Sequence, residues 1–291
     1  MPNTIQTILV TGANGQLGSE LRFLSEKFPT HKFIFTDYQE LSIDNKSDID
    51  TFFSKNSIQC CINCAAYTAV DKAESDVELA NKINGEAVGY LAEACNKHNA
   101  LFIHISTDYV FNGKASTPYQ VDHEVDPVNV YGSSKLLGEQ LAFKYNPQSI
   151  VIRTSWVYSS VGNNFVKTML RLMSERDSLS IVADQVGCPT YAADLAFAIM
   201  QIVTSNKANE NAGYYHYSNQ GVISWYEFAA AIKELANLTC TIQPIQTEAY
   251  PTPAKRPAYS VMDTSKIQTV FDITIPAWKD SLKICLAILL K

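Results

Sequence analysis

Glycine and proline are scarce in this sequence, which has 12 glycines and 11 prolines among its 291 residues. This scarcity excludes a fibrous or low-complexity chain. The sequence also lacks any apolar run that approaches the ~18 residues of a membrane-spanning helix. Its N-terminal stretch has neither the basic start nor the long apolar segment of a signal peptide. We therefore expect a cytoplasmic protein that makes no contact with a membrane.

Positive charge is also in short supply. The chain carries 23 lysines and arginines against 29 aspartates and glutamates, which gives a formal net charge of −6. A nucleic-acid-binding surface is not expected on such a chain. Hydrophobic residues make up 46% of the sequence and charged residues 18%, so the composition is that of a globular protein with a sizeable core.

The seven cysteines are an odd number at irregular spacings, which favours reduced thiols over a disulfide framework. Cys61 and Cys64 form a C-x-x-C pattern, but the surrounding residues read as a buried strand. Two strand residues three positions apart point to opposite faces, so these thiols do not form one site. The five histidines show no metal-ligand spacing. We expect no bound metal.

Strands and helices alternate through the first half of the chain. Apolar strands are predicted at 5–10, 33–36, 60–64, 101–106 and 150–154, and helices at 16–27, 46–54, 75–97 and 133–145. Such alternation predicts right-handed βαβ units, and the nearly continuous apolar strands indicate a sheet covered on both faces. The expected fold is therefore α/β, a Rossmann-type doubly wound parallel sheet.

The regular alternation of strands and helices ends after about residue 155. Helices are predicted near 163–176, 192–204, 225–238 and 278–290, and a stiff proline-rich loop at 250–257. We expect a dinucleotide-binding domain at 1–155 and a smaller C-terminal α+β substrate lobe at 156–291. A helix near 190–205 is expected to return to the first domain and pack on it. The site should lie in the cleft between them.

A glycine-rich turn follows the first predicted strand. Gly12, Gly15 and Gly18 would allow, in order, a tight turn, the approach of a pyrophosphate to a helix N-terminus, and close packing of helix and strand. Asp37 closes the second strand, where a carboxylate can bind an adenosine ribose and repel a 2′-phosphate. No basic residue stands at position 13, 14 or 38. NADH is therefore favoured, with NADPH possible.

Tyr131 and Lys135 are four residues apart and share one face of a predicted helix. A nearby ammonium, helped by an oxidised nicotinamide, would lower the pKa of a phenol and suit it to proton transfer. Thr107 ends the fourth strand at the sheet edge where ligands bind in such folds. Its hydroxyl could bind a substrate carbonyl, or simply cap the strand.

These features resemble the extended short-chain dehydrogenases/reductases, and more narrowly the dTDP-4-dehydrorhamnose reductase family. The similarity runs through nearly the whole chain, in segments 65–74, 106–111, 129–132, 153–158, 162–166 and 250–257. It implies hydride transfer from the nicotinamide to C4 of a dTDP-4-keto-6-deoxy-L-sugar, the last step of dTDP-L-rhamnose synthesis. Tyr131 would protonate the C4 oxygen, Lys135 would hold the ribose and tune Tyr131, and Thr107 would bind the same oxygen.

The resemblance also implies a set of ligand contacts. With the residues already named, the predicted cofactor site comprises Gly12, Asn14, Gly15, Gln16, Leu17, Gly18, Asp37, Ser42, Ile43, Ala65, Ala66, Tyr67, Thr68, Tyr131 and Lys135. The predicted substrate site comprises Thr107, Asp108, Trp156 and Arg256. Trp156 would offer an apolar wall to the sugar or act as a plain core residue. Arg256, with Lys255, would meet the nucleotide diphosphate or lie on a solvated loop.

Oligomeric state stays open between monomer and homodimer. Some family members pair through Mg²⁺ held by acidic residues near the C-terminus, whereas residues 280–291 contain no glutamate here. Two other functions compete with the reductase. One is a non-catalytic dinucleotide-binding protein like the regulatory subunit of methionine adenosyltransferase, and the other is a different nucleotide-sugar reductase or epimerase. The presence of Thr107, Tyr131 and Lys135 favours an enzyme.

Overall fold

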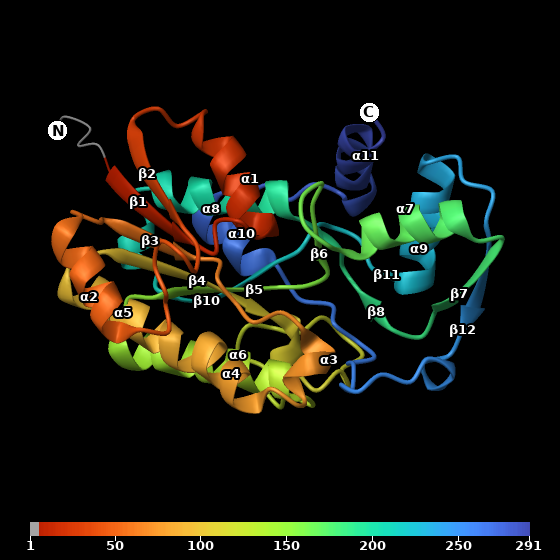
Figure 1. Cartoon of the computed structure of the whole chain (residues 1–291), viewed down its shortest axis with the longest axis horizontal. Helices are drawn as coiled ribbons and strands as arrows, with labels where there is room; N and C mark the ends of the chain where they lie inside the picture. The colour runs from red at the N-terminus through yellow and green to blue at the C-terminus, as the bar shows by residue number, and fades with distance from the viewer. Residues whose placement is uncertain (1–5) are drawn as a thin grey trace.

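The computed structural model describes residues 6–291, so Ile5, which we expected in the first strand, lies outside them. A larger lobe is built on one sheet, and a smaller lobe stands beside it (Figure 1). The chain crosses between the lobes more than once, because α8 and α10 return to the sheet after the chain has entered the smaller lobe. The division at residue 155 therefore stays a prediction.

Six parallel strands form the central sheet in the order β10-β5-β4-β3-β1-β2. Their bounds are β1 Gln6–Thr11, β2 His31–Thr36, β3 Cys60–Asn63, β4 Leu101–Thr107, β5 Ile150–Thr154 and β10 Gly213–Tyr217. The order reverses next to β1, as in doubly wound sheets. This confirms the predicted α/β fold class. The sixth strand, β10, was not predicted.

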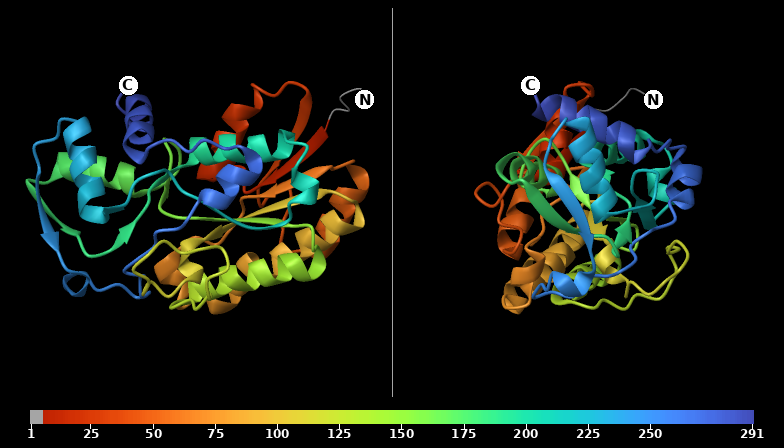
Figure 2. Two further views of the ribbon diagram at one scale, coloured as in Figure 1. Left: turned by 180° about the vertical axis from the view of Figure 1, so that it is seen from behind. Right: turned by 90° about the vertical axis from the view of Figure 1, so that its right-hand side faces the viewer.

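Helices cover both faces of the sheet (Figures 1 and 2). The covering helices are α1 Gln16–Ser25, α8 Ala192–Thr204 and α10 Ser265–Phe271 on one face, and α2 Lys46–Lys55, α5 Ala87–Lys97 and α6 Val130–Tyr145 on the other. Strand β1 shows how the sequence divides between the two cores. Ile8 and Val10 pack with the first group of helices, whereas Leu9 packs with the second, because successive strand residues face opposite sides.

The long helix predicted at 75–97 is interrupted. Only its second half forms the regular helix α5. The short helices α3 Val70–Ala73 and α4 Val77–Asn81 come before α5, and a π-helical turn at Lys82–Glu86 joins α4 to α5. Asn84 lies in that turn and is fully buried. Its amide pairs with the backbone of Tyr67 at 2.8 and 3.0 Å and donates to the Ser134 hydroxyl at 3.0 Å. The irregular turn thereby ties the loop after β3 to helix α6.

The smaller lobe has its own apolar core, formed mainly by helices and two short paired strands. Its elements are α7 Phe165–Glu175, β7 Ser178–Val182, α9 Trp225–Leu235, β12 Thr241–Ile245 and α11 Trp278–Leu289. Four short strands lie in this lobe or between the two lobes: β6 Val157–Tyr158, β8 Val186–Gly187, β9 Thr190–Tyr191 and β11 Ile223–Ser224. Ser224 begins α9 with a capping box that Glu227 completes. Within residues 6–291, no helix is both long enough and apolar enough to cross a membrane.

Candidate active site

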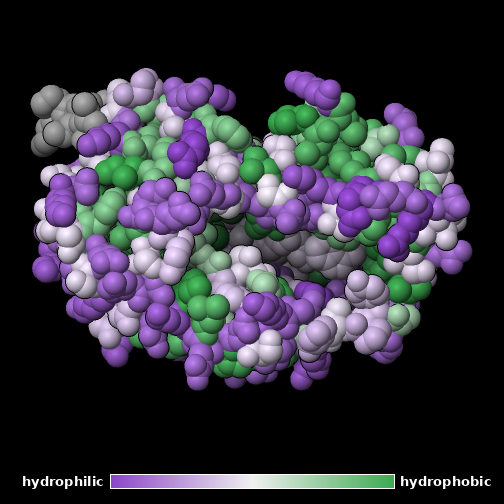
Figure 3. Space-filling view, in the orientation of Figure 1, coloured by the Kyte–Doolittle hydropathy of each residue, from purple (hydrophilic) through white to green (hydrophobic). Residues whose placement is uncertain are grey.

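A cavity of about 730 Å³ opens at the carboxyl ends of the sheet strands, where the two lobes meet. The space-filling view shows a hollow at this place (Figure 3). The predicted site residues that line it are Gly12, Gly15, Gln16, Leu17, Asp37, Ile43, Ala65, Ala66, Thr68, Thr107, Asp108, Tyr131, Lys135 and Trp156. Of the predicted set, Asn14, Gly18, Ser42, Tyr67 and Arg256 do not line it.

The glycine-rich turn fits a phosphate-binding role. Gly12 has φ +64°, and a Cβ there would come within 2.6 Å of the Ala65 backbone, so no other residue fits. Gly15 is the N-cap of α1, whose N-terminus therefore faces the cavity. A Cβ at Gly18 would come within 2.4 Å of the Gly12 carbonyl oxygen. Gly18 thus packs against the turn itself, rather than against the strand as we expected.

Asp37 follows β2 and stands at one end of the cavity. One carboxylate oxygen accepts from the Asn14 amide at 3.0 Å, and the other accepts from the Tyr38 amide at 2.8 Å. Asn14 therefore contributes through its backbone, by joining the glycine turn to Asp37. Beside them, Asp44 lines the cavity and pairs with Lys82 at 2.7 Å. Nothing in the local sequence marks Asp44, because its position depends on the loop between β2 and α2.

Helix α6 begins earlier than predicted, at Val130 instead of residue 133. Asn129 is its N-cap, and the Asn129 side chain accepts from the Gly132 amide at 2.7 Å. Tyr131 therefore lies in the first turn of the helix, and its ring packs edge-on against Tyr109 with centroids 5.5 Å apart. Burial raises the pKa of the Tyr131 phenol, while a hydrogen bond with Thr107 acts in the opposite direction. The phenol is thus protonated at neutral pH.

Lys135 is not among the groups that shift the pKa of the Tyr131 phenol in the described residues, so its expected effect on Tyr131 beside a bound nicotinamide stays a prediction. Its side chain is 2% exposed, and its Nζ donates to the Ile105 carbonyl at 2.6 Å. Burial lowers the pKa of the Lys135 ammonium to about 8. The ammonium is directed to the backbone of β4, and the structure gives it no hydrogen bond to the phenol among the described residues.

A buried polar chain runs from β1 to Lys135 beneath the cavity. Asn63 Oδ1 accepts from the Thr11 hydroxyl at 2.6 Å and from the Ala65 amide at 3.2 Å. This orientation points the Asn63 amide nitrogen at His104 Nδ1, 3.1 Å away, so Nδ1 accepts and Nε2 carries the ring proton. His104 Nε2 is 3.4 Å from Lys135 Nζ. Burial, not His104, is the cause of the lowered pKa of the Lys135 ammonium.

His104 was not predicted to belong to the site. A signal was present for His104, because it interrupts the otherwise apolar run of β4. A buried polar side chain in such a strand needs partners, and here the Asn63 amide supplies one at 3.1 Å.

Thr107 combines both roles that the sequence left open. Its hydroxyl accepts from the Tyr109 amide at 3.3 Å, which caps a short 3₁₀ turn, and donates to Asp108 Oδ1 at 2.9 Å. Burial raises the pKa of Asp108 to about 6, against which its hydrogen bonds act. The other carboxylate oxygen of Asp108 is buried and has no hydrogen-bond partner among the described residues. An unpaired buried oxygen beside a cavity is suited to a donor group on a ligand.

Trp156 lines the cavity from the side of the smaller lobe. Its backbone has φ +49°, an uncommon value for a large residue. The Trp225 ring stacks on it, with centroids 3.6 Å apart and an angle of 10° between the planes. This stacking fixes the indole as a flat apolar wall. The role of Trp225 could not be predicted from spacing, because the two residues lie on different elements.

Comparison with known proteins agrees with this geometry. Residues 6–290 match the family model described as the RmlD substrate binding domain. A dTDP-4-dehydrorhamnose reductase of Aggregatibacter actinomycetemcomitans is 43% identical over 285 residues, which covers 95% of this chain and 97% of that protein.

Two solved structures are also similar along their whole length. A dTDP-4-dehydrorhamnose reductase of Clostridium acetobutylicum has a TM-score of 0.93 at 42% identity, and covers 98% of this chain and 100% of its own. One of Bacillus anthracis, in complex with NADP, has a TM-score of 0.92 at 37% identity, and covers 98% of this chain and 99% of its own. The chain therefore belongs to the RmlD family of dTDP-4-dehydrorhamnose reductases.

Proposed function

We propose that this chain catalyses the NAD(P)H-dependent reduction of the C4 keto group of dTDP-4-dehydro-L-rhamnose, the last step of dTDP-L-rhamnose synthesis. The observation that carries the proposal is the convergence of Thr107, Tyr131 and Lys135 on one cavity that also contains the glycine turn and Asp37. The named relatives support the choice of substrate. A cytoplasmic location stays a prediction.

The described residues fit a bound dinucleotide. Gly12 and Gly15 line the cavity at the N-terminus of α1, where a pyrophosphate would bind, and Asp37 lines the same cavity and would bind the ribose. When bound, the nicotinamide supplies the hydride that is added to C4 of the sugar. Asp37 favours NADH, although the structure of the Bacillus anthracis relative contains NADP.

Each polar residue near the reacting carbonyl is assigned one task. Tyr131, whose pKa is raised, gives its phenolic proton to the C4 oxygen as the C–O double bond becomes a single bond. Thr107 would bind the same oxygen by turning its one hydroxyl proton from Asp108 Oδ1 to the sugar. Asp108 would accept from a sugar hydroxyl through its unpaired oxygen, and Trp156 would pack against the apolar face of the sugar.

The direct experiment is an NAD(P)H oxidation assay with dTDP-4-dehydro-L-rhamnose compared with other nucleotide-linked keto sugars. We expect turnover with the dTDP sugar and much less with the others. A chain that binds NAD(P)H but turns over none of them would instead support a non-catalytic dinucleotide-binding protein. Nicotinamide that stays tightly bound through purification and is recycled in turnover would support an epimerase.

We expect Asp37→Ala to change the preference between NADH and NADPH by about tenfold or more in favour of NADPH. The substitution removes a ribose hydrogen bond to a charged group, worth roughly 1.5–3 kcal/mol, and also removes repulsion of a 2′-phosphate. The measurement is kcat/KM for each cofactor. Since Asp37 also holds the Asn14 amide, both values are expected to fall. An unchanged ratio would show that Asp37 is not at the ribose.

Thr107→Val is expected to lower kcat by about 10- to 100-fold and to leave NADH affinity nearly unchanged. Valine keeps the shape of threonine but removes the hydroxyl that contacts Asp108 and lowers the pKa of Tyr131. Thr107→Ser is the matched control, because it retains the hydroxyl and should keep most of the activity. A Thr107→Val protein that loses NADH affinity but keeps kcat would place Thr107 in the cofactor site.

A further inference from the structure

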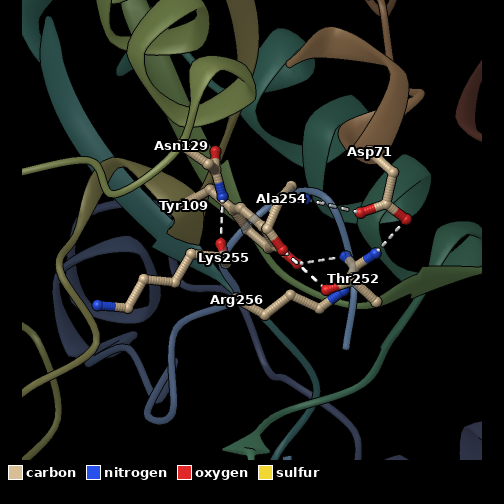
Figure 4. Close-up of polar contacts among 7 residues, drawn as sticks. All are labelled: Asp71, Tyr109, Asn129, Thr252, Ala254, Lys255 and Arg256. Carbon is tan, nitrogen blue, oxygen red and sulfur yellow. Dashed lines mark hydrogen bonds and ion pairs between the residues drawn. The ribbon is translucent and has the colours of Figure 1, made fainter. Parts of the chain in front are cut away.

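The proline-rich loop near the C-terminus is fixed to the larger lobe by a set of polar contacts (Figure 4). Arg256 Nη2 is 2.8 Å from Asp71 Oδ2, and Arg256 Nη1 donates to the Tyr109 hydroxyl at 3.1 Å. The Ala254 amide donates to the other oxygen of Asp71 at 3.3 Å. The Asn129 side chain donates to the Lys255 carbonyl at 2.8 Å. Three successive loop residues are therefore bound to Asp71 or to the N-cap of α6.

Arg256 is turned toward these partners and does not line the cavity. Figure 4 shows its guanidinium between the Asp71 carboxylate and the Tyr109 hydroxyl. A planar guanidinium with two fixed partners is held in one orientation, as a bidentate cation is suited to do. By contrast, the Lys255 side chain extends away from the cluster, and only its carbonyl takes part. The two neighbouring cations of the loop thus have different surroundings.

Tyr109 connects this cluster to the reacting phenol. Its hydroxyl is held by Arg256, and its ring packs edge-on against Tyr131 at 5.5 Å with an angle of 80° between the planes. Tyr109 also lines the cavity. Movement of its ring would therefore change the wall against which Tyr131 rests. Asn129, which caps the helix that carries Tyr131, is bound to the same loop.

We infer that Asp71 and Arg256 are positioning residues for the reaction, which fix Tyr109 and through it the proton donor Tyr131. The inference rests on the proposed function, and it replaces the expectation that Arg256 meets the nucleotide diphosphate. The ion pair is partly exposed, with side-chain exposures of 26% for Arg256 and 41% for Asp71. Pairs of this kind contribute little to stability, so their loss should be seen in catalysis more than in unfolding.

The test is a double-mutant cycle on Arg256→Met and Tyr109→Phe. Each single variant is expected to lower kcat about tenfold, because a small misplacement of a reacting group is costly. The kcat of the double variant should lie within about twofold of the kcat of either single variant, since both substitutions break the same chain of contacts. The KM for the dTDP sugar and the NADH affinity should change little. Arg171→Met, which breaks an exposed ion pair on α7 and does not line the cavity, should behave like the wild type.

Three outcomes would overturn the inference. Arg256→Met could raise KM and keep kcat, which would return Arg256 to the diphosphate. The losses of the two single variants could multiply in the double variant, or Arg171→Met could be as slow as Arg256→Met. If Arg256→Met does not fold, Asp71→Asn breaks the same pair with a smaller change of shape, and the same fall in kcat is expected.

The wild-type rate separates this inference from the proposed function. A wild-type chain that does not reduce the dTDP sugar overturns the proposed function, and the inference with it. An active wild-type chain whose Asp71→Asn and Arg256→Met variants keep their kcat overturns the inference alone.

Discussion

Tyr131→Phe is expected to lower kcat by about 10²–10⁴-fold, the usual contribution of a general acid. The substitution removes only the hydroxyl. The ring keeps its edge-on contact with Tyr109, and α6 keeps its cap at Asn129. The cofactor-binding turn lies on a different element, so the affinity for NADH should be nearly unchanged. The measurement pairs steady-state kinetics on the dTDP sugar with a titration of NADH.

A fall in NADH affinity with unchanged kcat would place the Tyr131 hydroxyl in the cofactor site. Turnover like that of the wild type would show that another group supplies the proton. Asp108 is the first alternative to test in that event, since burial raises its pKa to about 6 and it lines the same cavity. If Asp108 supplies the proton, Asp108→Asn should lower kcat strongly. If Tyr131 supplies it, the same substitution should lower kcat only modestly.

Lys135→Met should also reduce turnover, by about 10²-fold or more. Methionine nearly retains the length of the side chain but has no amine, so the contacts to Ile105 and His104 are lost together with the group expected at the ribose. The wild-type rate should fall as pH rises through about 8, because the Lys135 ammonium loses its proton there. The pH profile of kcat/KM measures this. A rate that stays level well above pH 8 would contradict the assigned role of the ammonium.

The same substitution is expected to stabilise the fold at neutral pH. Burial lowers the pKa of Lys135 to about 8, so between pH 8 and its unfolded value near 10.5 the unfolded chain binds the extra proton. At pH 7 this difference in pKa destabilises the folded wild-type chain by about 3 kcal/mol. Methionine removes that destabilisation, but the loss of the hydrogen bond to Ile105 offsets part of the gain. We expect Lys135→Met to raise the free energy of unfolding by about 1–2 kcal/mol.

The pH dependence of the free energy of unfolding, measured with a denaturant, gives a second check. Wild-type stability should rise between about pH 8 and 10.5, since the unfolded state releases a proton there that the folded state has already lost. The advantage of Lys135→Met should therefore shrink over the same range. An advantage that is absent at pH 7, or that grows with pH, would show that the buried ammonium is not destabilising.

Most of the central sheet could be predicted from the sequence, because its first five strands are short apolar runs separated by helices. Strand β10 could not. Its residues, Gly213–Tyr217, are mostly aromatic and polar, and the strand pairs with β5 from about sixty residues away. Helix α6 begins three residues before its predicted start because Asn129, a strong N-cap residue, caps it.

The site was predictable where its chemistry depends on local spacing. The glycine turn, Asp37 and the pair Tyr131 and Lys135 each lie within a few residues of a strand end or within one helical turn. The surroundings of these groups were not predictable, because they come from distant segments. Asp71 and Arg256 are 185 residues apart, and the Ile105 carbonyl that accepts from Lys135 lies 30 residues before it. Only the fold brings such partners together.

The central claim is that hydride from the nicotinamide reaches C4 of the sugar. It is tested most directly by turnover of dTDP-4-dehydro-L-rhamnose with NADH that carries deuterium at the transferred position, followed by mass and NMR analysis of the product. We expect dTDP-L-rhamnose with one deuterium at C4 for each NADH oxidised, and almost none with Tyr131→Phe in the same time. A product without deuterium at C4, or no oxidation of NADH or NADPH by the wild-type chain, would contradict it.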